Sequence, residues 1–213
     1  MSQPLLDELN QGLSAMQLSL PAGVPEKLIE YIDLLNHWNK AFNLTAIRDP
    51  AEMVSKHLLD SLAVLPYLGD ARSLIDVGTG AGLPGIPLAL CRPDIRMVLN
   101  DCIGKKTRFL TQAKLMLGLD NVEVVNQRIE DYRPIEQGRA IYFDLVIARA
   151  YAASDVIVAG TRHLHHPGTR ILVMQGKPDP RLTVAGYCVQ QSHTLYIAGL
   201  TAERHLLEIT QTH

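Results

Sequence analysis

Four glycines follow an apolar run in the segment LIDVGTGAGLPGIPLAL, which spans residues 74–90. The glycines are Gly78, Gly80, Gly82 and Gly85. A tight turn between a strand and a helix needs one or two glycines, so four indicate a loop whose backbone approaches a ligand closely. The last three match the G-x-G-x-x-G pattern of dinucleotide sites, and Asp101 follows at the distance where a ribose-binding acid belongs.

Asp76 discriminates between two classes of ligand, because it ends the predicted strand two residues before Gly78. A dinucleotide would place its pyrophosphate at the start of the following helix, where the Asp76 carboxylate repels it. S-adenosylmethionine has a cationic amino-acid end, a sulfonium and no phosphate, so it suits this turn better. We therefore predict that S-adenosylmethionine is bound by Asp76, Gly78, Gly80, Gly82 and Asp101. Asp101 would accept hydrogen bonds from both ribose hydroxyls. The rival enzyme class is a nicotinamide-dependent oxidoreductase.

An α/β arrangement is predicted to position this loop. Short apolar runs alternate with helical patterns from residue 73 onward, which is typical of a parallel sheet covered on both faces. The predicted strands are Leu74–Val77, Arg96–Leu99, Val122–Val125, Phe143–Ala148 and Thr169–Met174. The predicted helices lie near Ile86–Cys91, Lys105–Leu117 and Ala153–Leu164. No helical pattern separates Tyr187–Ile197 from His205–Ile209, so these runs predict an antiparallel C-terminal hairpin at the sheet edge.

The first seventy residues predict a helical extension. One helix is indicated by apolar residues at helical spacing, namely Leu28, Ile32, Leu35 and Trp38. A second helix begins at Asp49, which supplies an acidic N-cap before a proline and a glutamate at favourable positions. Its apolar side carries Met53, Leu58, Leu62 and Leu65. We divide the chain into a helical N-terminal extension, residues 1–70, and a main domain, residues 71–213.

The composition predicts an ordinary globular protein with a sizeable core. Hydrophobic residues make up 47% of the 213 residues, and the net charge is −2. This charge does not advertise a nucleic-acid partner, although a local basic face can exist within a neutral total. The three cysteines show no C-x-x-C spacing, which favours reduced thiols. Because no apolar run reaches the roughly 18 residues of a membrane helix and no signal peptide is evident, we expect a cytoplasmic protein.

Three motifs, taken together, resemble the RsmG (GidB) family. They are NKAFNLT at residues 39–45, HLLDS at residues 57–61 and DVGTGAGLPGIP at residues 76–87. The resemblance continues through Gly104–Leu110, Arg149-Ala150 and Glu203–His205, so it covers nearly the whole chain. Members of this family are bacterial S-adenosylmethionine-dependent methyltransferases that modify N7 of one guanosine in small-subunit (16S) ribosomal RNA.

The resemblance implies a Rossmann-like methyltransferase fold, which agrees with the α/β pattern above. It also implies ribosomal RNA or the small ribosomal subunit as the partner. It implies cofactor contacts from Gly78, Leu83, Ile129, Glu130 and Arg149. Arg149 is also the candidate catalytic residue, because it could contact guanine O6 as N7 becomes positive. The alternative is that Arg149 serves only the cofactor. A monomer is expected. A methyltransferase acting on a protein or a small molecule is the remaining alternative.

A basic cluster is the candidate RNA-binding surface. Lys105, Lys106 and Arg108 lie at the start of a predicted helix, where cations are unfavourable for the helix dipole, which suggests that they face phosphate. Arg48 and Arg204 would extend this surface. In the N-terminal part, Asn43 and His57 are further candidates, and His57 would share one polar face with Asp60 and Ser61 at the floor of the active site.

Two further local features bear on charge and on metal binding. Gln175 stands where the family usually shows a lysine, which removes one cation from this position. His163, His165 and His166 have no cysteine or acidic partners at metal-ligand spacing, so we predict a surface loop there and no metal.

Overall fold

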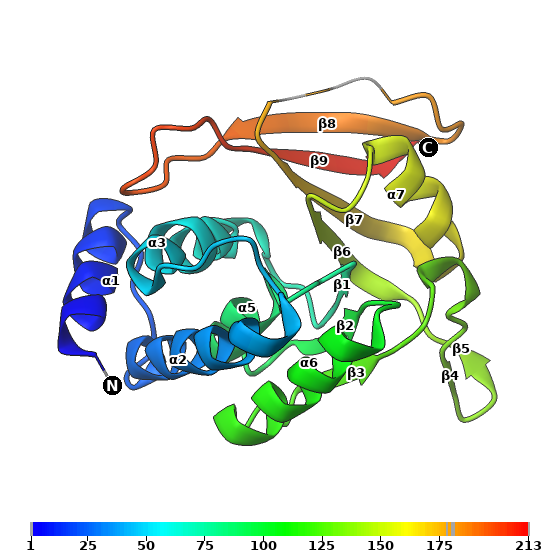
Figure 1. Ribbon diagram of the computed structural model, residues 1–213. Helices are drawn as coiled ribbons and strands as arrows, with labels where there is room; N and C mark the ends of the chain where they lie inside the picture. The colour runs from blue at the N-terminus through cyan, green and yellow to red at the C-terminus, as the bar shows by residue number, and fades with distance from the viewer. Residues whose placement is uncertain (1, 178, 180–181, 213) are drawn as a thin grey trace.

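A computed structural model describes residues 2–177, 179 and 182–212 of the chain. A seven-stranded sheet forms its centre, with helices on both faces (Figure 1). The strand order is β3-β2-β1-β6-β7-β9-β8. The strands are β1 (Ser73–Val77), β2 (Arg96–Asn100), β3 (Val122–Val125), β6 (Phe143–Arg149), β7 (His165–Gln175), β8 (Tyr187–Thr194) and β9 (His205–Gln211).

The predicted fold class is confirmed. The strands β3, β2, β1, β6 and β7 pair in parallel, whereas β9 pairs antiparallel with both β7 and β8. Each predicted strand of the parallel sheet has a counterpart, and the C-terminal hairpin lies at the sheet edge as expected. The chain order reverses between β1 and β6, which makes the carboxyl ends of these strands the place where ligands of such sheets collect.

Apolar side chains alternate between the two faces along each central strand. Leu74 of β1 packs with Leu145 and Ile147 of β6 on one face, in the core that also includes α5 (Gly85–Cys91) and α6 (Gly104–Leu117). Ile75 packs on the other face with α7 (Ser154–Thr161). This alternation follows from the period of two in a strand, and it points Asp76 to the same face as Leu74.

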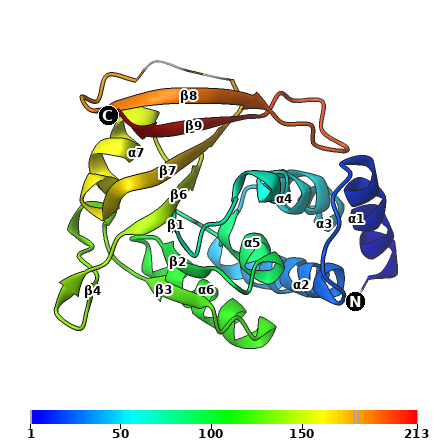
Figure 2. The same cartoon turned by 180° about the vertical axis from the view of Figure 1, so that it is seen from behind.

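The N-terminal helices cover the face that carries α5 and α6 (Figure 2). They are α1 (Gln3–Ala15), α2 (Val24–Phe42), α3 (Pro50–Met53), the π-helical segment η1 (Val54–Leu59) and α4 (Asp60–Leu62). Asp49 caps α3 as predicted, because its side chain accepts a hydrogen bond from the Ala51 amide. The division at residue 70 stays a prediction, and the buried residues of this segment share one core with the sheet.

The second N-terminal helix was expected to be a regular α-helix through Leu65, and this is wrong for its middle. Six residues, Val54–Leu59, form a π-helix between α3 and α4. Such wide turns are rare in proteins, and those that occur are often found at functional sites. The wider turn changes the faces to which the side chains after Val54 point, including that of Asp60.

The surface loop predicted for the three histidines is also wrong in part. His165 begins β7 and is buried, with Nδ1 2.8 Å from the Tyr187 hydroxyl and Nε2 2.9 Å from Thr161 Oγ1. Burial lowers the pKa of His165 to about 4, so this side chain is a neutral core group. A two-stranded ribbon of β4 (Ile135–Glu136) and β5 (Arg139–Ala140) was not predicted.

Across the residues that the structure describes, no helix is long and apolar enough to cross a membrane. In the same residues, no group of three histidine, cysteine or acidic side chains could hold a metal ion.

Candidate functional site

The carboxylate of Asp76 lies inside the glycine loop that follows β1. Its side chain is fully buried, and Oδ2 accepts hydrogen bonds from the Gly85 amide at 2.8 Å and from Thr79 Oγ1 at 2.6 Å. Oδ1 is buried and has no hydrogen-bond partner among the described residues. Burial raises the pKa of Asp76 to about 6, although these two hydrogen bonds oppose the rise. The loop is therefore built around an anionic group with an unused acceptor.

Glycine is required in this loop for two reasons, namely the backbone conformation and the close packing of neighbouring side chains. Gly78, Gly80 and Gly82 have φ angles of 65°, 63° and 90°, in the region that favours glycine. A Cβ on Gly82 would lie 2.5 Å from Ile86 Cδ1, and one on Gly85 would clash with Leu99. Gly82 and Gly85 are thus required by packing, whereas a Cβ on Gly80 would approach no atom closer than 3.9 Å.

Asp101 holds the loop from the neighbouring strand. It follows β2 and is buried, and its Oδ2 accepts from the Gly80 amide at 3.0 Å and from Lys106 Nζ at 3.2 Å. Its Oδ1 accepts from the Ile103 amide at 2.9 Å. Asp101 therefore ties the glycine loop to the start of α6, and Lys106, one of the predicted RNA-binding cations, forms an ion pair with it.

These contacts test the choice of ligand. Two amides of the loop, those of Gly80 and Gly85, already donate to protein carboxylates. A pyrophosphate would need such amides and would also meet the charges of Asp101 and Asp76. A ligand with a cationic end and no phosphate meets neither obstacle. The residues present therefore fit S-adenosylmethionine, and the buried charge of Asp76 beneath the loop favours its cationic end.

A tyrosine from the N-terminal helices supports the same loop. Tyr31 of α2 is fully buried and donates its hydroxyl hydrogen bond to the Ala81 carbonyl at 2.7 Å. Sequence reasoning missed this residue, because Tyr31 is one apolar position of a helical pattern and nothing in the pattern indicates its partner. The N-terminal helices thus position the loop and do not only cover the sheet.

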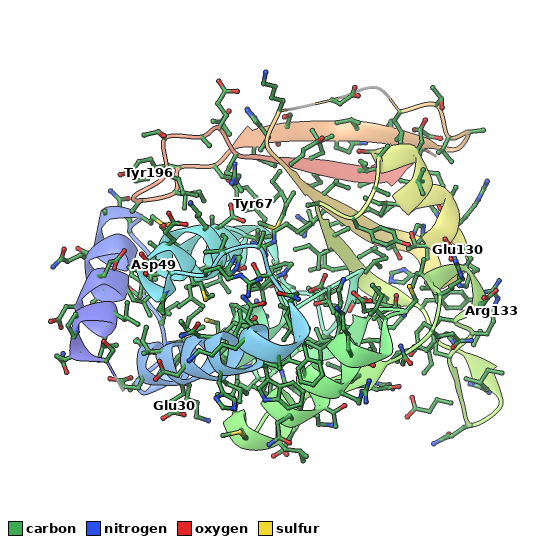
Figure 3. The ribbon with its side chains drawn as sticks, in the orientation of Figure 1. Glu30, Asp49, Tyr67, Glu130, Arg133 and Tyr196 are labelled. Atoms are coloured by element: carbon green, nitrogen blue, oxygen red, sulfur yellow. The ribbon has the colours of Figure 1, made fainter. Side chains whose placement is uncertain are left out.

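Ile129 and Glu130 form a short 3₁₀ turn, η3 (Ile129–Asp131), after β3. Ile129 is buried in the core that contains α7, and Glu130 is exposed beside α7 (Figure 3). Their place near the carboxyl end of β3 agrees with a contact to the adenosine part of the cofactor, which stays a prediction.

A cavity of about 530 Å³ adjoins the loop, within the range of small-molecule sites. The π-helix, the glycine loop, the ends of β6 and β7, and the connection between β8 and β9 all contribute to its wall. The lining residues are Leu44, Thr45, Ile47, Lys56, His57, Asp60, Gly78, Thr79, Gly80, Ala81, Leu83, Arg149, Ala150, Met174, Gln175, Gly176, Leu200, Ala202 and Arg204.

Two arginines meet at Asp60 in this wall. Arg149 Nη1 lies 2.9 Å from Asp60 Oδ2 and also donates to the Lys56 carbonyl, while Arg204 Nε lies 2.9 Å from Asp60 Oδ1. We call Arg149 and Arg204 the arginine pair. Their side chains are 18% and 28% exposed, whereas that of Asp60 is 4% exposed. The cavity therefore presents two guanidinium groups fixed by one buried carboxylate.

His57 lines the cavity as a neutral group. Its Nε2 lies 2.9 Å from Thr45 Oγ1, and its Nδ1 lies 3.1 Å from the Lys56 carbonyl. Burial, with the nearby charge of Arg149, lowers the pKa of His57 to about 4. At neutral pH this side chain offers hydrogen bonds but no positive charge.

The structure separates the other predicted RNA-binding residues into two places. Arg48 is exposed, follows the cavity-lining residue Ile47 and donates to the Asn43 side chain. Lys105 and Arg108 lie on α6, beyond Asp101, and Arg108 donates to the Gly104 carbonyl. Of the predicted RNA-binding residues, His57 and Arg204 therefore line the cavity, whereas Lys105 and Arg108 do not.

Comparisons with known proteins give a consistent result. A family model described as rRNA small subunit methyltransferase G matches residues 25–207. Ribosomal RNA small subunit methyltransferase G of Pseudomonas aeruginosa (strain LESB58) is 44% identical over 209 residues, which cover 97% of this chain and 95% of that protein. The protein of the same name from Alkalilimnicola ehrlichii is 45% identical over 97% of this chain and 93% of its own length.

Solved structures show the same fold at low identity. The O-methyltransferase TomG from Streptomyces achromogenes, in complex with SAM, superposes with a TM-score of 0.59 over the full length of both chains at 17% identity. TrmN from Thermus thermophilus superposes with a TM-score of 0.54 at 15% identity, covering 75% of this chain and 53% of that one.

Proposed function

Because the chain belongs to the rRNA small subunit methyltransferase G family, we propose that it methylates N7 of a guanosine in small-subunit (16S) ribosomal RNA, using S-adenosylmethionine. The observation that carries the proposal is the junction of two sites. A glycine loop held by two carboxylates, Asp76 and Asp101, opens directly into a cavity that contains the arginine pair.

The cofactor supplies an electrophilic methyl group on a cationic sulfur. The bond from N7 to the methyl carbon forms as the bond from carbon to sulfur breaks, so the positive charge passes from sulfur to the guanine ring. Guanine N7 carries a lone pair at neutral pH, and no proton has to be removed from it. The reaction therefore needs alignment more than acid or base catalysis, and alignment contributes up to about 7–11 kcal/mol in favourable cases.

The protein's own side chains fit this requirement. His57, with a pKa of about 4, is neutral at physiological pH and is not needed as a base. Arg149 lines the same cavity as the glycine loop and Asp60, and its charge acts on both Asp76 and His57. This position suits a side chain that orients the guanine next to the cofactor. A guanidinium that donates to O6 leaves N7 free to attack.

The experiment is a transfer assay with labelled S-adenosylmethionine. The protein is incubated separately with naked ribosomal RNA and with small subunits from a strain that lacks the activity, and the labelled nucleotide is mapped. Label at N7 of a single guanosine supports the proposal, and the substrate that accepts it distinguishes naked RNA from the assembled subunit. Label confined to protein or to a small molecule, or to another atom of RNA, refutes it.

A further inference from the structure

Asp60 joins three parts of the chain that are far apart in sequence. It lies at the start of α4, and its two oxygens bind Arg149 at the end of β6 and Arg204 in the connection before β9. The partners are 89 and 144 residues away in the sequence. Each guanidinium has five N–H donors, more than its contact with Asp60 uses. We propose that Asp60 is a positioning residue for methyl transfer, which both aims the arginine pair at the target nucleotide and offsets its charge.

The second role of Asp60 concerns the positive charge that passes to the guanine ring during the reaction. This step rests on the proposed function, in which positive charge develops on the guanine ring. Two guanidinium groups beside the ring oppose that development, because like charges repel strongly in a poorly solvated site. One carboxylate between them reduces the net charge of the three groups from +2 to +1. The arginine pair can then contact the nucleotide without an equal penalty on its methylation.

The other charged groups at the cavity do not replace Asp60. Among the described residues that line the cavity, Asp60 is the one acid. Lys56 pairs with Glu52 at 2.8 Å on the exposed side of the helix, and His57 is neutral. Asp76 is buried beneath the glycine loop and is not part of the cavity wall.

The geometry also limits what the arginine pair can contact. Arginine commonly donates to both O6 and N7 of guanine. An N–H donated to N7 would engage the lone pair that attacks the methyl carbon, so such a contact would inhibit the reaction. A guanidinium held by Asp60 is restricted in direction, and the useful contacts are O6 and phosphate. We therefore expect loss of Asp60 to impair turnover more than RNA binding.

The test compares Asp60→Asn with Asp60→Glu and with a matched control, Glu208→Gln. Glu208 pairs with Arg170 at 2.6 Å, and their side chains are 19% and 30% exposed, so the control removes a comparable partly buried ion pair between β7 and β9. Glu208 does not line the cavity. For each variant, kcat and KM are measured with the RNA substrate, S-adenosylhomocysteine binding by calorimetry, and stability by thermal unfolding.

For Asp60→Asn, we expect kcat to fall about tenfold or more. The KM for RNA should change by less than about threefold, because the additional net positive charge compensates in RNA binding for the lost orientation of the arginine pair. Binding of S-adenosylhomocysteine should be unchanged. Asp60→Glu retains the charge but moves the carboxylate by one methylene group, so its kcat should lie between that of Asp60→Asn and that of the wild type. Glu208→Gln should retain the wild-type kcat even if its unfolding temperature falls.

Several results would overturn the proposal. They are a wild-type kcat in folded Asp60→Asn, a loss confined to KM, or an equal loss of kcat in Glu208→Gln. If Asp60→Asn does not fold, Asp60→Glu decides, since a lowered kcat at unchanged KM supports the proposal and an unchanged kcat overturns it. Wild-type protein that labels no RNA would refute the proposed function and this inference together, whereas wild-type turnover with normal Asp60 variants refutes the inference alone.

Discussion

Replacing Asp76 by asparagine should stabilise the protein at neutral pH and weaken cofactor binding at the same time. The folded protein raises the pKa of Asp76 from its ordinary 3.8 to about 6, mainly through burial. Ionising the side chain therefore costs the folded state more than the unfolded chain. At about 1.36 kcal/mol per pKa unit, the cost is about 3 kcal/mol above pH 6.

The pH dependence has a definite sign. A carboxyl group whose folded-state pKa is raised contributes stability that is fully present below pH 3.8 and is lost as the pH rises through about 6. Asparagine mimics the protonated form, because its oxygen can accept from the Gly85 amide and Thr79 in place of Oδ2. The variant should lack this part of the pH dependence, and its advantage should grow from pH 4 to pH 7 toward about 3 kcal/mol.

Urea unfolding of both proteins between pH 4 and pH 8 measures this difference. Asp144→Asn is the matched control of opposite sign. Burial raises the pKa of Asp144, but hydrogen bonds from Arg72 and Ser73 outweigh it and leave the pKa lowered. Asp144→Asn should therefore lose stability at neutral pH, and its deficit should shrink as the pH falls.

Cofactor affinity provides the second readout for Asp76→Asn. Removal of the charge beneath the glycine loop, which attracts the cationic end of the ligand through the loop, should weaken S-adenosylhomocysteine binding about tenfold, measured by calorimetry. The reasoning is refuted if the variant is less stable than the wild type at pH 7 and equally stable at pH 4. It is also refuted if the two proteins show the same pH dependence and the same affinity.

The remaining predictions concern the loop, His57 and the choice of ligand. Gly82→Ala should lose more than about 1 kcal/mol of stability in urea unfolding, because its φ is 90° and its Cβ would lie 2.5 Å from Ile86; wild-type stability would contradict the packing argument. Gly78→Val should weaken S-adenosylhomocysteine binding in calorimetry, because Gly78 lines the cavity and a Cβ there would displace the Tyr151 ring or the loop; normal binding would contradict this role of Gly78. The kcat profile between pH 5.5 and 8 should show no step from His57, whose pKa is about 4, so a step near pH 6.5 that disappears in His57→Asn would disprove this assignment. In a thermal-shift assay, S-adenosylhomocysteine should raise the unfolding temperature and NAD and NADP should not, because the loop amides already donate to carboxylates; an equal shift with NAD would favour an oxidoreductase site.

The sequence by itself determined the order and type of the central elements. Apolar runs with strand spacing, glycine stops and an N-cap at Asp49 are local signals, and each depends on residues close together in the chain. They predicted the parallel strands, the C-terminal hairpin and the glycine loop correctly. They could not distinguish a glycine needed by a ligand from one needed by packing, because the Ile86 and Leu99 contacts of Gly82 and Gly85 arise only when the loop folds onto the sheet.

Only the tertiary structure decided which polar groups meet and how they are charged. Asp60 was assigned to a polar face, but its two arginine partners lie 89 and 144 residues away. The burial of His165 and the hydrogen bond from Tyr31 to the loop depend equally on distant segments. Side-chain pairing and desolvation are properties of the packed molecule, since they depend on sheet register and helix placement. A local pattern can therefore name a candidate residue, while its partners and its protonation state are set by the fold.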